Sequence, residues 1–321
     1  MKNDEPQPGT PQRADEHRDP RGLSRRAALK TGILAGAGVA SAGATLPSRS
    51  AAPPTDCESD PETKNMHLSL AAYSMRDALE SGEMNMFELV DWCAEMGLSG
   101  TELTSYFFEE GFDADYLHRL RGEAFHRGVS VSGTAIANNF CLPPGPKKQK
   151  QIAKVKQWID HAAELFAPHI RIFAGSLPEG TSRETGIEWV ADGIEKVLGY
   201  AQEQGIVLGL ENHGSFTGEL ETHLAICEEV GDSPWFGINL DTGNYLTKPY
   251  YSLAKAAPHA VNVQLKANVA GNDGTEEAVD LDRIKQILVE ADYKGWIVLE
   301  YEKENPRETI PKFVEELKRL Y

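Results

Sequence analysis

The feature that most constrains the fold is a regular alternation of short apolar runs with amphipathic stretches, which begins near residue 66 and continues to the end of the chain. The apolar runs have the length of buried strands. Between them, apolar residues recur with helical spacing, for example at Ile187, Val190, Ile194 and Val197. Strands that alternate with helices in this way predict a parallel sheet whose helices lie outside it.

Eight strand–helix units follow one another with no element left over. The strands are expected near residues 67–73, 98–103, 129–134, 169–175, 206–211, 235–241, 260–266 and 296–302. Eight such units in about 255 residues predict an α/β fold that closes into a single (β/α)₈ barrel. A doubly wound open sheet is the alternative, but no G-x-G-x-x-G motif follows the first strand.

The N-terminal part of the chain has a different composition from the barrel region, which we place at residues 66–321. Residues 1–22 are polar and rich in Pro, which predicts a disordered segment. Residues 23–54 contain a pair of arginines, a weakly apolar Ala/Gly stretch and small residues, and they resemble a twin-arginine export signal. Residues 55–65 are expected to be a linker.

The export signal implies passage through the twin-arginine machinery to the periplasm or the exterior. A disordered basic tail is the alternative interpretation of the paired Arg25 and Arg26. A transmembrane helix is not expected, because the run from Thr31 to Leu46 is short and rich in Gly. The protein is therefore predicted not to be an integral membrane protein.

Charge excludes one large class of partner. The chain has 32 Lys and Arg against 49 Asp and Glu, a net charge of −17. A surface this acidic repels phosphate backbones, so binding to nucleic acid is not expected. Composition leaves the oligomeric state open, including a homo-oligomer.

Polar residues cluster where the predicted strands end, which is the face on which (β/α)₈ barrels build their active sites. Candidates in chain order are Glu102, Asn138 and Asn139, Arg171, Glu211 and His213, Asp241 and Asn244, Gln264 and Lys266, and Glu300. We place Glu102, Glu211, Asp241 and Glu300 at the ends of strands, and Arg171, Gln264 and Lys266 within strands. All of them are expected to face one barrel mouth.

The carboxylates of Glu211, Asp241 and Glu300 come from the fifth, sixth and eighth strands. At close range they repel one another, which is costly in a poorly hydrated site. One divalent cation resolves the repulsion, and oxygen ligands favour Mg²⁺ or Mn²⁺. The alternative is that the carboxylates pair with basic residues as scaffolding, with Arg171 and Lys266 as the counter-charges.

Four segments carry a family resemblance in order on the last four strands: GLENHG, INLDTGN, VQLK and VLEYE. With IRIFAG and GTELTSYF on earlier strands, they resemble the sugar phosphate isomerase/epimerase group of xylose isomerase-like barrels over roughly residues 66–320. The resemblance implies one divalent metal ion held by residues that match Glu211, Asp241, Gln264 and Glu300. It also implies that Glu211 and Glu300 are the catalytic proton carriers.

Two residues depart from the group. Many members have His where this chain has Gln264, and Gln at this position is similar to the hydroxypyruvate isomerase branch. Many also have His where this chain has Asn244, three residues after the aspartate of the sixth strand. Asn244 cannot carry a proton as His does, which leaves the reaction chemistry open.

The resemblance implies a metal-dependent sugar isomerase or epimerase that acts through an enediolate, in which the metal chelates the carbonyl and an adjacent hydroxyl group. Glu102, Arg171, His213, Asn244 and Lys266 are expected to contact the carbohydrate substrate. His213 has the alternative role of a donor to a backbone carbonyl. We expect an unphosphorylated ketose or keto-sugar, because no Gly-rich phosphate loop is present and an exported enzyme has little access to sugar phosphates.

The same residues leave three other functions open. A metal-dependent lyase that eliminates from 3-keto-glycosides would share the enolate step and differ only in the leaving group. A sugar-binding barrel without catalysis is consistent with Gln264 and Asn244. An endonuclease IV-like enzyme requires several histidines and a basic groove, which this sequence does not provide.

Overall fold

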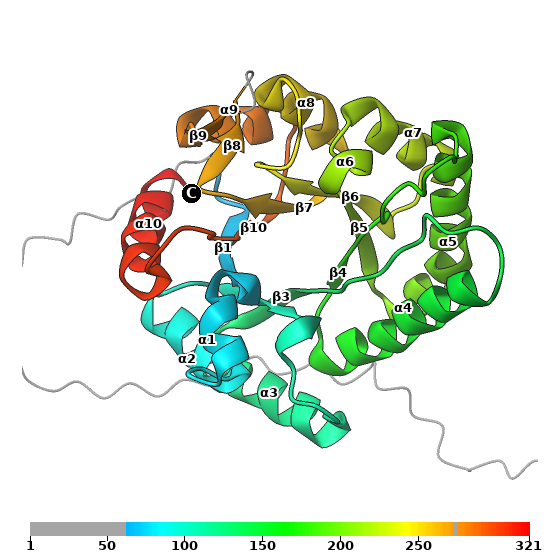
Figure 1. The fold of residues 1–321 in the computed structure, drawn as a ribbon. Helices are drawn as coiled ribbons and strands as arrows, with labels where there is room; N and C mark the ends of the chain where they lie inside the picture. The colour runs from blue at the N-terminus through cyan, green and yellow to red at the C-terminus, as the bar shows by residue number, and fades with distance from the viewer. Residues whose placement is uncertain (1–61, 272–274) are drawn as a thin grey trace, which may run out of the picture. The chain divides into compact units, whose positions relative to one another are not determined.

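The computed structural model describes residues 62–271 and 275–321, and these residues form a closed barrel of parallel strands (Figure 1). The strand order around the barrel is β1-β10-β7-β6-β5-β4-β3-β2, which confirms the predicted (β/α)₈ fold. The barrel strands are β1 (Met66–Ala71), β2 (Gly100–Thr104), β3 (Ser130–Ala135), β4 (His169–Ile172), β5 (Val207–Glu211), β6 (Phe236–Asp241), β7 (Ala260–Leu265) and β10 (Gly295–Leu299).

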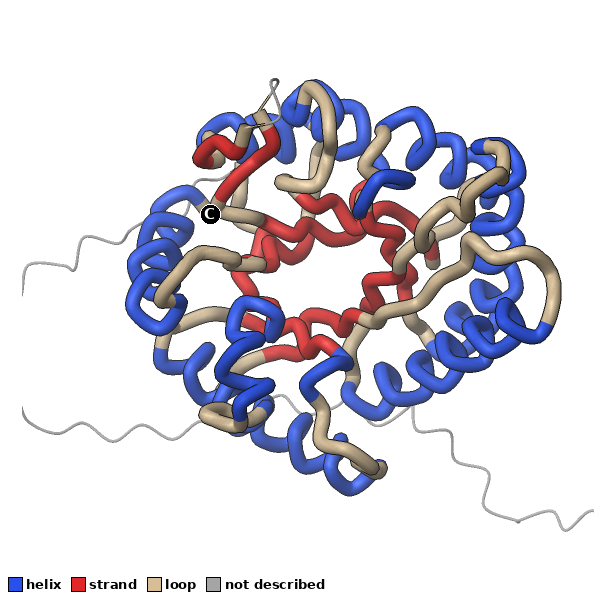
Figure 2. Tube along the Cα trace, viewed as in Figure 1, coloured by secondary structure: helices blue, strands red, loops and turns tan. Residues whose placement is uncertain are grey.

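Helices surround the strands as an outer ring (Figure 2). Each buries an apolar stripe against the barrel, as in the last helix, where Ile310, Val314 and Leu317 are buried. The ring consists of α2 (Met86–Glu95), α3 (Ala114–His126), α4 (Pro146–Leu165), α5 (Arg183–Gln204), α7 (Leu220–Val230), α8 (Pro249–Ala256), α9 (Leu281–Glu290) and α10 (Pro306–Leu320).

Several short elements were not predicted, because they contain too few residues to show a helical or strand period. Most follow the C-terminal end of a barrel strand and therefore border the mouth. They are η1 (Ala72–Met75), α1 (Arg76–Ser81), η2 (Ser105–Phe107), α6 (Gly214–Thr217), and the antiparallel pair β8 (Asn268–Ala270) and β9 (Glu276–Ala278). The short helix η3 (Ala257–His259) instead precedes β7.

The structure corrects three of the predicted strand positions. β2 continues past Glu102 to Thr104, because its pairing with β3 resumes after a register shift, so Glu102 lies within the strand. β7 and β10 stop one residue before Lys266 and Glu300. Glu300 stays in register all the same, since its backbone N–H donates to the Leu265 carbonyl at 2.9 Å.

The predictions for residues 1–22 and 23–54, and for most of the linker at 55–65, lie outside the described residues. Within the described part of the chain, no helix is both long and apolar enough to cross a bilayer.

Candidate active site

The inward-facing side chains near the mouth of the barrel are polar. Side chains alternate along each strand, so His169 and Arg171 of β4 face inward together, as do Asn239 and Asp241 of β6. All four are buried, and so is Gln264 of β7. Burying polar groups costs free energy unless they are hydrogen-bonded or paired. These side chains therefore need hydrogen-bond or ionic partners inside the barrel.

Glu211 is the most fully paired carboxylate at the mouth of the barrel. Arg171 Nε lies 3.0 Å from Glu211 Oε2, and Asn239 Nδ2 donates to the same oxygen at 3.4 Å. The other oxygen, Oε1, is 3.0 Å from His213 Nδ1 and accepts from Asn244 Nδ2 at 3.2 Å. Burial acts to raise the pKa of Glu211, but Arg171 and His213 hold it below the usual value. Glu211 is thus an ionised and rigidly held group.

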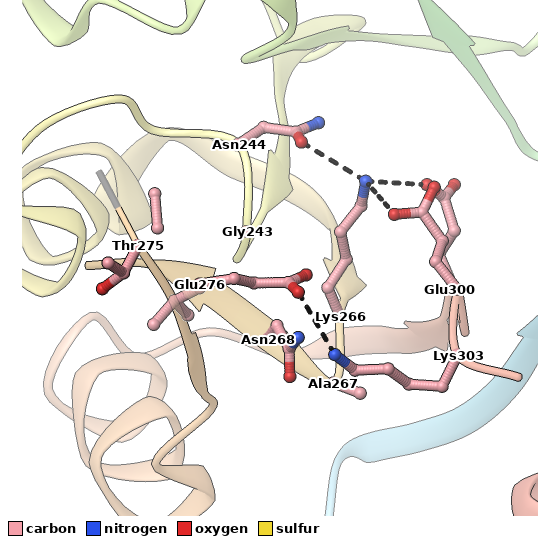
Figure 3. Close-up of a pocket in the computed structure, with 12 residues that line it drawn as sticks. Gly243, Asn244, Lys266, Ala267, Asn268, Thr275, Glu276, Glu300 and Lys303 are labelled. Atoms are coloured by element: carbon pink, nitrogen blue, oxygen red, sulfur yellow. Dashed lines mark hydrogen bonds and ion pairs between the residues drawn. The ribbon is translucent and has the colours of Figure 1, made fainter.

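Lys266 is the positive charge on the other side of the mouth. Its Nζ lies 3.2 Å from Glu300 Oε1, 3.1 Å from Glu302 Oε2 and 3.6 Å from Asp241 Oδ2. It also donates to Asn244 Oδ1 at 3.3 Å, and Figure 3 shows the side chain extended between Asn244 and Glu300. Burial acts to lower the pKa of Lys266, but the surrounding carboxylates raise it well above the usual value.

The buried carboxylic acids differ in their protonation. Burial raises the pKa of Asp241 and Glu300, and the charge of Glu211 adds to the effect while Lys266 opposes it. Burial raises the pKa of Glu102 to about 8. Glu211 is therefore held ionised while its neighbours retain protons more readily, which is the kind of separation that divides acid and base roles between carboxyl groups.

A chain of amides orients Gln264. Asn262 Nδ2 donates to Asn239 Oδ1 at 2.7 Å, and Asn239 Nδ2 donates to Gln264 Oε1 at 2.8 Å. The Gln264 amide nitrogen consequently faces Glu300 Oε2 at 2.5 Å and Glu102 Oε1 at 3.3 Å. In this arrangement Gln264 presents donors to the carboxylates, whereas its predicted role as a metal ligand requires its oxygen.

Sequence reasoning missed Asn239 and Asn262. They lie two residues before Asp241 and Gln264, so the alternation of side chains along a strand would have placed them on the same inner face. Sequence reasoning also left Asn212 without a role. Asn212 Nδ2 donates to the Asp241 carbonyl at 2.8 Å, and the Asp241 N–H donates to Asn212 Oδ1 at 2.9 Å. Asn212 therefore ties the end of β5 to the end of β6.

Aromatic rings flank Arg171. Its guanidinium carbon lies 3.9 Å from the ring centre of Phe173, and both terminal nitrogens are 3.4 Å from Tyr106 Oη. Phe173 also packs against the imidazole of His213, with ring centres 4.3 Å apart. Neither Phe173 nor Tyr106 was anticipated, because no strand-end pattern marks them. His213 faces Glu211 rather than a backbone carbonyl.

The donor atoms of the predicted metal ligands suit a divalent cation. Three are carboxylates, and Asp241 Oδ2 is buried without a hydrogen-bond partner, as a hard cation would require of a ligand. Their present arrangement is that of a charge-neutralised cluster, with Arg171 on Glu211 and Lys266 near Asp241 and Glu300. No group of three His, Cys, Asp or Glu within residues 62–271 and 275–321 forms a metal site as the side chains lie.

The cluster opens onto a pocket of about 240 Å³ at the mouth (Figure 3). Its walls include Asn244, Lys266 and Glu300, together with residues of the β8–β9 pair. On the outer rim, Lys303 Nζ lies 3.4 Å from Glu276 Oε2. Charged groups that are otherwise buried are therefore reachable by a small polar ligand.

Comparison with known proteins gives the same architecture. The sequence profile described as "Xylose isomerase-like TIM barrel" matches residues 90–320. No curated protein sequence matches the chain.

Three solved structures illustrate the similarity. D-psicose 3-epimerase of Clostridium cellulolyticum H10 with D-tagatose is 13% identical, with a TM-score of 0.66 over 79% of this chain and 98% of its own. The probable 3-DHS dehydratase AsbF of Bacillus anthracis is 20% identical, with a TM-score of 0.61 over 78% and 98%. The IOLI protein with a binding zinc atom is 15% identical, with a TM-score of 0.64 over 79% and 96%.

Proposed function

Because the chain belongs to the xylose isomerase-like TIM barrel family, we propose that it is a sugar isomerase or epimerase acting on an unphosphorylated ketose or keto-sugar. The observation that carries the proposal is the grouping of Glu211, Asp241 and Glu300 around Lys266 and Arg171 at the open end of the barrel. Removing a proton next to a carbonyl requires a base and a positively charged group that stabilises the resulting oxyanion. These residues supply both.

Glu300 is the better placed of the two proposed proton carriers. It lines the pocket, and its raised pKa brings it closer to neutral pH, where proton transfer in both directions is efficient. Glu211 is held ionised by Arg171, His213 and Lys266, and it takes or returns the proton on its own side of the substrate. Two acids on opposite faces give an epimer, whereas one acid that shuttles between adjacent carbons gives an isomer. Lys266 and Arg171 stabilise the developing negative charge.

We also propose that Glu211, Asp241 and Glu300 hold one divalent cation, Mg²⁺ or Mn²⁺, with Gln264 as the fourth ligand once its amide is reversed. Bound there, the cation would polarise the substrate carbonyl as a Lewis acid. The similar IOLI structure is described as having a bound zinc atom, which supports a metal-binding role for this fold. Lys266 has to withdraw from Asp241 and Glu300 for this to happen, and Glu302 offers it an alternative partner. Elemental analysis and calorimetric titration with Mn²⁺ test the metal directly.

Solvent deuterium exchange tests the reaction. We expect the full chain to incorporate deuterium from D₂O next to the carbonyl of a ketose, and Glu211→Gln and Glu300→Gln each to lower the rate by about 10²–10⁴-fold. Glu315→Gln, on the exposed face of α10, is the matched control and should not change the rate. Exchange that persists in both site variants would contradict the assignment.

Elimination from a 3-keto-glycoside is the second candidate reaction, because it begins with the same proton abstraction. The similar AsbF structure is described as a probable dehydratase, which is an eliminating enzyme. Product analysis separates the reactions, since a lyase releases a leaving group and an isomerase does not. Metal-dependent sugar affinity without any exchange would instead indicate a binding protein.

We further propose that residues 23–54 direct export by the twin-arginine route to the periplasm or the exterior. The paired arginines carry this proposal. Replacing both Arg25 and Arg26 with Lys should leave the protein inside the cell, as fractionation and immunoblotting would reveal. Unchanged export would contradict the proposal.

A further inference from the structure

The barrel mouth contains a second pocket that the proposed proton transfer does not use. It has a volume of about 260 Å³ and is lined by Asn138, Asn139, Phe173, Ser176, His213 and Ser215, among others. These residues follow β3, β4 and β5, whereas the pocket of Figure 3 is built from residues that follow β6, β7 and β10. The two pockets therefore occupy different arcs of the same mouth.

The walls of the two pockets meet at Glu211. His213 of the second pocket lies 3.0 Å from Glu211 Oε1, and Asn244 of the first pocket donates to the same oxygen at 3.2 Å. The two wall residues are thus within two hydrogen-bond lengths of each other, with a proposed catalytic carboxylate between them. A ligand that reaches both pockets therefore passes close to Glu211, which itself lines neither of them.

The lining of the second pocket suits a ring with a flat face and a polar edge. Phe173 and His213 pack together at 4.3 Å, and the His213 side chain is 52% exposed, so its ring is accessible to a ligand. Ser176 and Ser215 provide hydroxyl groups at the rim. Asn139 also lines the pocket, and its buried Oδ1 has no hydrogen-bond partner, so its amide can turn toward a ligand hydroxyl without losing a hydrogen bond at that oxygen.

Each pocket is smaller than the roughly 300–1,000 Å³ that is typical of sites for drug-sized ligands, so each accommodates a unit of about one ring. We propose that the substrate is a glycoside of two linked rings, with the keto-sugar in the pocket of Figure 3 and the attached ring in the second pocket. The choice of which ring reacts rests on the proposed function, because Glu300 and Lys266 line only the first pocket.

The test compares deuterium exchange on D-fructose with exchange on isomaltulose, in which a glucose unit is attached to fructose. We expect kcat/KM for isomaltulose to be at least about tenfold higher, because the glucose unit adds contacts in the second pocket. Ser215→Trp fills this pocket and should bring the ratio of the two constants close to one. Ser81→Trp, at the exposed end of α1, is the matched control and should preserve the ratio.

A second variant and a second ligand sharpen the test. Asn139→Leu removes the buried acceptor and should reduce kcat/KM for isomaltulose more than for D-fructose, which protects the test if Ser215→Trp fails to fold. A phenyl 3-keto-glucoside, compared with 3-keto-glucose, tests an aromatic attached ring in the same way as isomaltulose compared with D-fructose tests a sugar. The pair with the larger gain in kcat/KM identifies the ring for which the pocket is built.

The outcomes separate this proposal from the general function. Wild-type exchange on each free sugar that equals or exceeds exchange on its glycoside would overturn the glycoside assignment and leave the isomerase or epimerase function intact. Equal losses on D-fructose and isomaltulose in the Ser215 and Asn139 variants would also overturn it, since the pocket would then belong to a monosaccharide site. Absence of exchange on all four ligands would instead remove the proposed function.

Discussion

Replacing Lys266 with Met is expected to destabilise the metal-free protein strongly. The Lys266 side chain is 13% exposed, and its ammonium group lies between Glu300, which is 8% exposed, and Asp241, which is fully buried. Removing one partner of a buried ion pair typically costs about 3–5 kcal/mol, because the remaining charge is left uncompensated. Glu302 contributes little to this figure, since its side chain is 41% exposed and hydrated.

The loss of unfolding free energy in Lys266→Met should become larger as the pH rises. Burial and mutual repulsion already raise the pKa of Asp241 and Glu300, and removing Lys266 raises both further. A carboxyl group whose pKa is raised by folding binds protons more tightly in the folded state, so its effect on stability becomes less favourable as pH rises through that range. The Lys266→Met variant should therefore lose less stability at about pH 5.5 than at about pH 8.

Urea unfolding in the presence of a chelator measures both effects. Lys303→Met is the matched control, because its partner Glu276 is 70% exposed and such surface pairs contribute at most about 1 kcal/mol. The expected result is a large, pH-dependent loss for Lys266→Met and a small, pH-independent loss for Lys303→Met. Equal small losses for the two variants would refute the assignment of Lys266 as the counter-charge of the cluster.

Three further predictions follow from the same geometry. Mn²⁺ should raise the melting temperature of Lys266→Met more than that of the wild type, because the ammonium group no longer competes for the carboxylates; an equal shift in both would contradict this. Gly209→Ala should cost about 1–3 kcal/mol of unfolding free energy, since a Cβ there would meet His169 Nε2 at 2.3 Å, whereas Gly199→Ala on α5 meets nothing within 4 Å and should not destabilise. Burial lowers the pKa of His169 to about 3, so the free energy of unfolding should fall as the pH drops below about 6.5. His169→Gln should make this decline shallower by up to about 1.4 kcal/mol per pH unit, as chemical denaturation would measure.

The barrel could be predicted from the sequence because the alternation of strand and helix extends along the chain and repeats eight times. A helix such as α5 shows its buried face over many residues, and small errors at its ends leave the topology unchanged. The mouth elements could not be predicted in the same way. The four residues of α6 and the three-residue strands β8 and β9 are too short to show any period, although they shape the two pockets.

The identity of the site residues could be predicted better than their pairing. Glu211 and Asp241 end apolar strands, and this position alone places them at the mouth. Sequence reasoning left open whether a metal ion or basic residues balance these charges. The structure adds the pairing that the sequence could not give: Arg171 lies against Glu211 and Lys266 lies near Asp241 because their strands are neighbours in the barrel.

Asn244 illustrates how one departure from the family pattern acquires a structural role. Its Nδ2 donates to Glu211 Oε1 at 3.2 Å while its Oδ1 accepts from Lys266 at 3.3 Å. An amide carries donor and acceptor at adjacent positions, whereas the ring nitrogens of His lie on separate sides of the imidazole. Asn244 therefore bridges Glu211 and Lys266 with one side chain, so a displacement of Lys266 changes the hydrogen bonding of Glu211. This link from Glu211 to Lys266 and Glu300 runs beside the one through Asn239 and Gln264. Asn244→Ala should therefore shift the pH profile of exchange in the wild type more than in the Glu211→Gln variant, in which residue 211 no longer titrates; equal shifts in the two backgrounds would contradict the coupling.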